Sequence, residues 1–160
     1  MRRANRGFTL LEILLGVSII AASFLGVLTV FDRLTKSSRE MVELTKANFL
    51  LEEAVEAART WRDNSWTNFA NWSSGTSYYL VWSNGRWATT TSNTFFEGKF
   101  ERKVRLNDVS RDATSDDIVS SGGTNDSGTK LFTATVAWYS NAKGATTTKT
   151  LVTYFSDIFN

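Results

Sequence analysis

Hydrophobic and polar positions divide the chain into three stretches with different periodicities. Residues 8–31 are almost entirely apolar, with one acid, Glu12, followed by an uncharged run from Ile13 to Phe31. A continuous apolar run of this length is typical of a helix that can cross a bilayer. From Leu34 onward the apolar residues become periodic, and after about Asn64 they alternate as in strands.

Residues 32–63 predict an amphipathic continuation of the same helix, because neither glycine nor proline interrupts them. Apolar residues recur there at alternating spacings of three and four, with two polar members, which predicts one buried stripe. The stripe consists of Leu34, Ser37, Met41, Leu44, Asn48, Leu51, Val55 and Ala58. We therefore expect one helix from Phe8 to about Asp63 whose second half packs against the rest of the chain.

Residues 64–160 predict a C-terminal globular domain of about five strands, mostly antiparallel. Asn84-Gly85 between two β-rich runs is typical of a hairpin turn, since both positions must accept positive φ. Residues 100–106 alternate as in a half-buried strand, with Arg102 as the one misfit among the even-numbered apolar positions.

The remaining C-terminal segments complete this domain. Two further strands are expected at 131–140 and 146–155, and polar loops are expected at 64–77 and 113–130. An amphipathic helix laid on an antiparallel sheet buries the apolar faces of both. The predicted fold class is therefore α+β, with one long N-terminal helix packed on a C-terminal sheet.

Composition argues against catalysis, because cysteine and histidine are both absent from the 160 residues. Without cysteine there is no disulfide or thiolate metal site, and without histidine the commonest general base is missing. No nucleophile elbow, phosphate-binding loop or dinucleotide fingerprint is present. The sequence predicts a protein that is not an enzyme and needs no cofactor.

The positive charge of the chain is concentrated at its beginning. Arg2, Arg3 and Arg6 are the only charged residues among the first seven, whereas the formal net charge of the whole chain is only +2. Basic residues before an apolar helix hold that side in the cytoplasm. This distribution favours orientation at a membrane over nucleic-acid binding by the rest of the chain.

Three polar or aromatic groups offer alternative chemistry. Oxygen ligands for calcium could come from Asp116, Asp117, Asn125 and Asp126, although their spacing matches no EF-hand and solvated loop acids are the favoured interpretation. Basic residues gather at Lys99, Lys103, Arg105 and Arg111. A solvated strand face is the favoured interpretation of this cluster, and contact with nucleic acid is the lesser alternative.

Tryptophan is concentrated at the start of the predicted domain, where five of the six lie between Trp61 and Trp87. They could form a stacking platform for glycans or single-stranded nucleic acid. The favoured interpretation is structural: Trp82 and Trp87 are cross-strand partners, and the others cover the end of the helix.

Two features of the apolar run suggest contacts with other helices. Ser18, Ala22 and Gly26 recur every four residues, a pattern that lets a second helix approach closely, although a membrane helix also simply tolerates small residues. The carboxylate of Glu12 is costly in lipid and is expected to have a partner or a function.

Residues 6–12, Arg-Gly-Phe-Thr-Leu-Leu-Glu, followed by the apolar run, resemble the class III signal of type IV pilins and pseudopilins. The resemblance implies a leader, residues 1–7, that prepilin peptidase removes after Gly7, and methylation of the new terminus at Phe8. It also implies that Glu12 pairs with the amino terminus of a neighbouring subunit and sets the stagger between subunits.

The same resemblance implies a location and partners. Before assembly the helix lies in the inner membrane, with its N-terminus in the cytoplasm and the β-domain outside. Afterwards it forms the core of an extracellular or periplasmic filament. The implied partners are other pilin or pseudopilin subunits, prepilin peptidase, the inner-membrane assembly platform and the lipid bilayer.

The departures from the major pilins indicate a subclass. Thr29 stands where many major pilins carry proline, and the disulfide-closed C-terminal loop is missing because there is no cysteine. Both features fit a minor pilin or pseudopilin at least as well as a major subunit, in a type IV pilus or in a related type II secretion or DNA-uptake filament.

The competing function is a conventionally secreted or membrane-tethered β-rich adhesin or binding domain. Ala21 and Ser23 could occupy the −3 and −1 positions of an ordinary signal-peptidase site, so that the mature chain would begin at Phe24. Glu12 within the hydrophobic region and the uninterrupted helix argue against this alternative. The residue at which the mature chain begins distinguishes the two.

Overall fold

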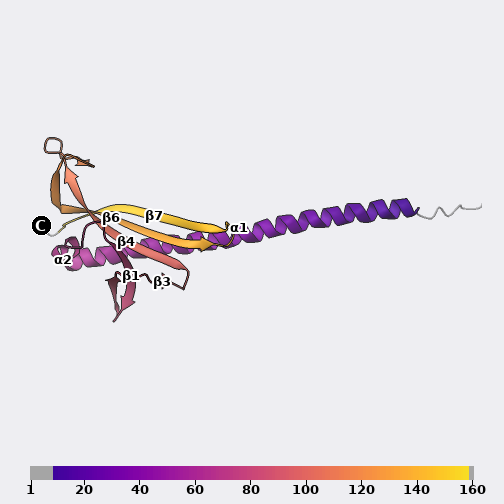
Figure 1. Ribbon diagram of the computed structural model, residues 1–160, viewed down its shortest axis with the longest axis horizontal. Coiled ribbons are helices and arrows are strands. Elements are labelled where there is room, and N and C mark those ends of the chain that lie inside the picture. Colours follow the sequence, from indigo (N-terminus) through magenta and orange to yellow (C-terminus); the bar gives the residue numbers. More distant parts are fainter. Residues whose placement is uncertain (1–8, 159–160) are drawn as a thin grey trace, which may run out of the picture. The chain divides into compact units, whose positions relative to one another are not determined.

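The chain divides into two compact units, Met1–Met41 and Val42–Asn160. The computed structural model, drawn in Figure 1, describes residues 9–158. Helix α1 (Leu10–Asn64) runs through both units without a break, so the predicted long helix is confirmed from Leu10 onward. A short helix, α2 (Trp66–Ala70), follows it, and the side chain of Ser65 caps α2 by accepting a hydrogen bond from the Asn68 N–H.

The rest of the second unit is a single antiparallel sheet. Its strands are β1 (Ser77–Ser83), β2 (Arg86–Thr90), β3 (Phe95–Phe96), β4 (Phe100–Arg111), β5 (Ile118–Val119), β6 (Thr124–Ser140) and β7 (Ala145–Ser156). The main path has the order β2-β1-β4-β6-β7, and the short strands β3 and β5 both pair with β4. This confirms the predicted α+β class, with a five-strand path and two short additions.

The hydrophobic core lies where the C-terminal part of α1 runs along the sheet, as Figure 1 shows for β4, β6 and β7. The helix contributes Ala47, Leu50, Leu51, Ala54, Ala57 and Ala58. The sheet contributes Leu80, Phe100, Val104, Leu106, Phe132, Ala134, Val136, Trp138 and Phe155. Four of the six helix residues are alanine, which lets the helix backbone approach the large sheet side chains closely.

The buried stripe of α1 differs in part from the prediction. Leu51 and Ala58 are buried as expected, and Leu44 and Val55 pack against the core. Asn48, however, is exposed, while Ala47 and Ala54 are completely buried. The buried face of α1 therefore includes Ala47, Leu50, Ala54 and Ala57, which the predicted stripe left out, whereas its members Leu34 and Met41 are 64% and 62% exposed.

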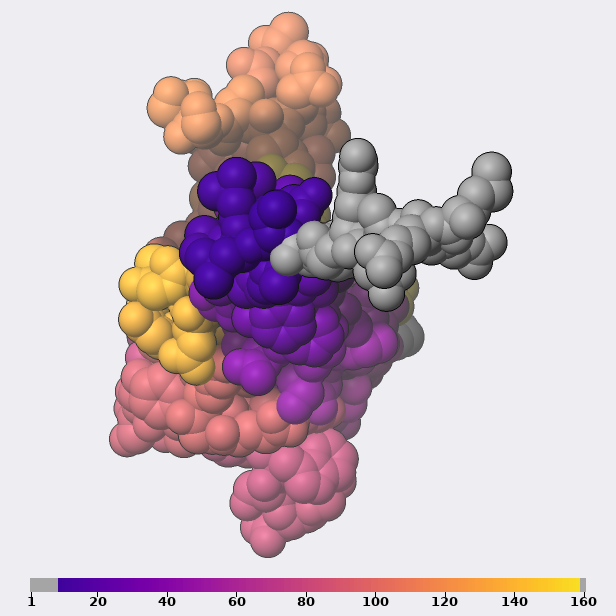
Figure 2. Space-filling view, turned by 90° about the vertical axis from the view of Figure 1, so that its right-hand side faces the viewer, coloured from indigo at the N-terminus to yellow at the C-terminus, as the bar shows by residue number. Residues whose placement is uncertain are grey.

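The predicted hairpin and strand alternation are confirmed. Asn84 and Gly85 have φ of 52° and 75°, and they join β1 to β2 with Trp82 opposite Trp87. In β4 the even-numbered positions 100–106 are buried, Arg102 among them. Figure 2 shows the tip of this hairpin, in pink, and the segment around β5, in orange, projecting on opposite sides of the second unit.

The two predicted loops contain regular structure. Residues 64–77 include α2, and residues 113–130 include β5 and the first seven residues of β6. The expectation of a loop up to residue 130 is therefore wrong, because Thr124–Asp126 pair with Val109–Arg111 beyond a register shift between Asp108 and Val109. Pairing with β4 overrides the weak strand preference of this Gly-, Asn- and Asp-containing segment.

Candidate functional site

The described part of the N-terminal signal begins with a capping box. Thr9 precedes the helix, and its hydroxyl accepts a hydrogen bond from the Glu12 N–H at 3.3 Å. The Glu12 carboxylate in turn accepts from the Thr9 N–H at 2.9 Å and from its hydroxyl at 3.1 Å. This reciprocal pair satisfies two donors at the helix end. The Thr-x-x-Glu pattern of residues 9–12 is the sequence signal for this capping box, whereas the sequence prediction treated Glu12 only as a lone carboxylate.

The hydroxyl groups of the apolar segment point back to their own helix. Ser18, Ser23 and Thr29 donate to the carbonyl oxygens four residues earlier, at 2.7, 2.8 and 2.9 Å. Bonds of this kind satisfy polar groups where lipid offers no partner. Within residues 9–158, α1 is the one helix long and apolar enough to cross a membrane, judged by length and composition.

The small-residue stripe of Ser18, Ala22 and Gly26 lies on an exposed face. A Cβ built on Gly26 would meet no atom within 4 Å. The large apolar residues around the stripe are also exposed, from Leu28 at 48% to Ile20 at 69%. Helix packing on this stripe therefore remains a prediction, and such packing would require atoms from another molecule. The predicted leader and cleavage residues Arg2, Arg3, Arg6, Gly7 and Phe8 lie outside the described residues.

Ion pairs fix the second part of α1 to the strands. Lys99 pairs with Glu43, whose other carboxylate oxygen accepts from Trp138 Nε1 at 3.0 Å. Lys46 pairs with Glu97 at 2.7 Å, in the turn before β4. These ion pairs therefore add an electrostatic contribution to the apolar packing between α1 and the sheet.

The stability of this unit is expected to fall in acid partly through Glu43. Burial alone would raise the pKa of Glu43, but hydrogen bonds from Lys99 and Trp138 outweigh it and lower the pKa below the ordinary carboxyl range. A lowered pKa in the folded state contributes stability above the unfolded-state pKa, and this stability is lost as the pH falls through the folded-state pKa. Glu43→Gln is therefore expected to lower Tm near neutral pH and to approach the wild-type Tm in acid.

This expectation can be measured by thermal unfolding of the detergent-solubilised chain between about pH 7 and about pH 3. Glu52→Gln, the same change on the exposed side of α1, is the control. Asp108 and Asp126 also have lowered pKa values, held down by Lys130 and Arg111 respectively, so the wild type keeps some acid sensitivity in the variant. A Tm difference that stayed constant over the whole pH range would contradict the assigned role of Glu43.

The basic cluster is largely neutralised by neighbours. Beyond the Lys99 pair, Lys103 lies 3.0 Å from Glu101, and Arg105 donates to the Ser77 hydroxyl at 2.9 Å. Arg111 Nε donates to Asp126 at 2.7 Å. Three of the four cations are thus paired with a carboxylate, whereas the uncharged Ser77 hydroxyl does not balance Arg105, and one cation is a weak footprint for a phosphate backbone.

The predicted calcium candidates surround an arginine. Besides its bond to Asp126, Arg111 donates through Nη1 to the carbonyl oxygen of Asp116 at 2.9 Å. Asp117 contributes a further attractive charge and Asn125 pairs with Ser110 in the sheet. Among residues 9–158 no three histidine, cysteine, aspartate or glutamate side chains are grouped so that they could hold a metal ion. Here the guanidinium supplies the positive charge that these oxygens face.

The tryptophans separate into two groups. Trp61, Trp66 and Trp72 pack against the core, with the rings of Trp61 and Trp72 5.0 Å apart and Trp61 Nε1 donating to the Trp87 carbonyl at 3.2 Å. Trp82 and Trp87 face each other across the hairpin, as predicted, with centroids 5.0 Å apart. Trp82 nevertheless remains 62% exposed.

Comparison with known protein families finds the prokaryotic N-terminal methylation motif over residues 2–28. This motif is the class III prepilin signal found in type IV pilins and pseudopilins, and the long helix packed on an antiparallel sheet is a pilin-like fold. No curated protein and no solved structure matches the chain.

Proteins of the type IV pilin and pseudopilin family, which carry this motif, share several functional properties. Its members are structural subunits and not enzymes. They are processed by prepilin peptidase and assemble with other pilin subunits. They reside in the inner membrane before assembly and in a surface filament afterwards.

Proposed function

We propose that this chain is a minor pilin or pseudopilin subunit of a type IV pilus or of a related type II secretion or DNA-uptake filament. Prepilin peptidase cuts after Gly7 and methylates Phe8, and the apolar part of α1 then passes from the membrane into the filament core. The observation that carries the proposal is the methylation motif over residues 2–28, followed by a helix whose apolar side chains are exposed. Such a surface is suited either to lipid or to the helices of other subunits.

Glu12 has a specific role in this proposal. The capping box satisfies its hydrogen bonds, but Thr9 carries no charge that could neutralise the carboxylate. A positively charged amino terminus at Phe8 of a neighbouring subunit would neutralise it, and that pairing would offset the cost of removing Glu12 from water. Because each subunit would offer both groups, the same contact would repeat along a filament.

The adhesin alternative requires a different mature terminus. Cleavage after Ser23 would cut the chain inside a continuous helix, because α1 extends without interruption from Leu10 to Asn64. The Ser23 hydroxyl donates a hydrogen bond to the Ile19 carbonyl oxygen within this helix. The helical continuity on both sides of this bond favours the filament function.

Intact mass measurement and N-terminal sequencing of the native, membrane-extracted protein test the proposal. A chain beginning at N-methylated Phe8 is the expected result. A chain beginning at Phe24 would replace the filament function by a secreted domain. An uncut chain in a host with active prepilin peptidase would leave a membrane-tethered β-domain.

A further inference from the structure

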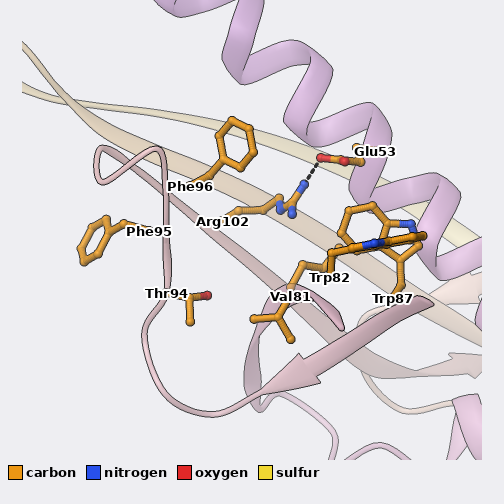
Figure 3. A pocket seen from close by; sticks show the side chains of 9 residues that line it. Glu53, Val81, Trp82, Trp87, Thr94, Phe95, Phe96 and Arg102 are labelled. Atoms are coloured by element: carbon orange, nitrogen blue, oxygen red, sulfur yellow. Dashed lines mark hydrogen bonds and ion pairs between the residues drawn. The ribbon is translucent and has the colours of Figure 1, made fainter. Parts of the chain in front are cut away.

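A cavity of about 710 Å³ opens beside the β1–β2 hairpin, and none of the contacts assigned to filament assembly uses it. Figure 3 shows its walls: Trp82 and Trp87 from the hairpin, Phe95 and Phe96 from β3, Glu53 from α1 and Arg102 from β4. All these residues belong to the second unit. The volume lies within the range of sites that hold small organic ligands.

The aromatic walls of the cavity are exposed, whereas several other aromatic side chains of this unit, such as Phe69 and Phe132, are buried. Trp82 is 62% exposed, Phe95 55% and Phe96 43%, whereas Phe100 in the next strand is 2% exposed. Leaving several large rings in water forgoes the stabilisation that their burial would give. Clustered exposed aromatic residues beside a cavity are characteristic of binding surfaces.

The polar wall is an ion pair with unused hydrogen-bonding capacity. The Arg102 side chain is 6% exposed and donates through Nη1 to Glu53, whose side chain is 40% exposed. The guanidinium also lies 5.2 Å from the Trp87 ring centroid. Arg102 Nε is buried and has no acceptor in the described part of the chain. A guanidinium offers five donors and a carboxylate accepts several bonds, so this pair can both donate to and accept from a ligand.

The charges of the residues that line the cavity restrict the chemical class of ligand that it can bind. One arginine and one glutamate cancel, so the walls carry no net charge to attract an anionic polymer, and the exposed Glu53 carboxylate would repel phosphates. A purely apolar ligand would remove the ion pair from water without replacing its hydrogen bonds, which is costly. The walls instead match a neutral molecule that has apolar ring faces and many hydroxyl groups.

We propose that this cavity binds a neutral pyranose oligosaccharide. Sugar C–H groups pack on the exposed face of Trp82, while neighbouring hydroxyls donate to Glu53 and accept from Arg102. The proposal goes beyond the filament function and does not depend on it, because every residue involved lies in the second unit. It assigns a role to Arg102, the strand position that the alternating pattern left unexplained.

The test uses the full chain, solubilised in a zwitterionic detergent without a sugar headgroup. The fluorescently labelled protein is applied to an array of neutral, sialylated and sulfated glycans, and the strongest neutral oligosaccharide is then titrated by calorimetry. Saturable binding that changes little between low and high salt is expected, since a neutral ligand is not screened. Trp82→Ala is expected to weaken this binding about fivefold to tenfold, and Trp82→Phe is expected to restore most of it.

Tyr154→Ala is the matched control, because Tyr154 is an aromatic residue on β7, 50% exposed and outside the cavity walls. Unfolding temperatures of all variants are compared, so that a folding defect is recognised. Absence of binding to every neutral glycan would overturn the proposal, as would equal losses in Trp82→Ala and Tyr154→Ala. Salt-sensitive binding only to anionic glycans or to oligo-dT would assign the cavity to another ligand class. Loss of filament incorporation in Trp82→Ala, without sugar binding by the wild type, would assign it to a neighbouring subunit.

Discussion

Replacing Glu12 by valine is expected to leave the leader cleavable and to reduce incorporation into filaments by roughly tenfold or more. Valine suits the membrane better than glutamate does, so the variant protein should accumulate normally in the bilayer. It cannot, however, attract the amino terminus of a neighbouring subunit. The measurement compares mature variant protein in membrane and sheared-filament fractions, with wild-type subunits supplied by the host.

Glu12→Gln separates the two roles of this side chain. Glutamine can still close a capping box with Thr9, because its amide oxygen accepts the same hydrogen bonds, but it carries no charge. We expect Glu12→Gln to fail in assembly as valine does. Normal assembly of the glutamine variant would mean that Glu12 acts as a helix cap. Glu52→Val, the same loss of charge on the exposed side of α1, should assemble normally.

Replacing Gly7 by valine is expected to block maturation almost completely, so that nearly all of the protein keeps residues 1–7. Glycine has no Cβ, and a backbone without side chain can approach a protein surface that valine cannot. Intact mass of the membrane-extracted variant reports the uncut chain directly. Asn5→Val, the same new side chain two residues earlier, should be cut normally. Normal maturation of Gly7→Val would place the cleavage site elsewhere.

Local sequence signals were sufficient for much of the fold. Asn84-Gly85 gave the hairpin because few residue pairs accept two positive φ angles. The alternation in residues 100–106 gave the buried face of β4, since a strand turns every second side chain to the same side. The absence of glycine and proline after Leu34 gave the continuation of α1. Each of these signals lies within a few residues of the structure that it specifies.

The features that were missed depend on partners far away in the sequence. Arg102 looked out of place in its strand because its partner, Glu53, lies 49 residues earlier on α1. Which positions of α1 are buried, Ala47 and Ala54 and not Asn48, follows from the side of the helix that the sheet covers. The start of β6 at Thr124 depends on β4 continuing beyond its register shift. None of these distances between elements can be obtained from the periodicity of one segment.

The same distinction between local signals and distant partners applies to the candidate site. The methylation motif was recognisable because its defining residues are consecutive. The cavity was not, because four separate segments supply its walls and tryptophan clustering alone favoured simple packing. That interpretation holds for Trp61, Trp66 and Trp72, whereas Trp82 remains open to solvent.

If the chain is extracted from a membrane into a filament, as proposed, the ion pairs of α1 have a mechanical consequence. Glu43, Lys46 and Glu53 lie at successive levels of α1, and their partners all lie within residues 97–102. A force along the helix axis would therefore load the three pairs in parallel, in shear, instead of breaking them one after another. That load would enter the sheet at the turn before β4 and at the start of β4, which is paired with β1, β3, β5 and β6 and so distributes it over several strands.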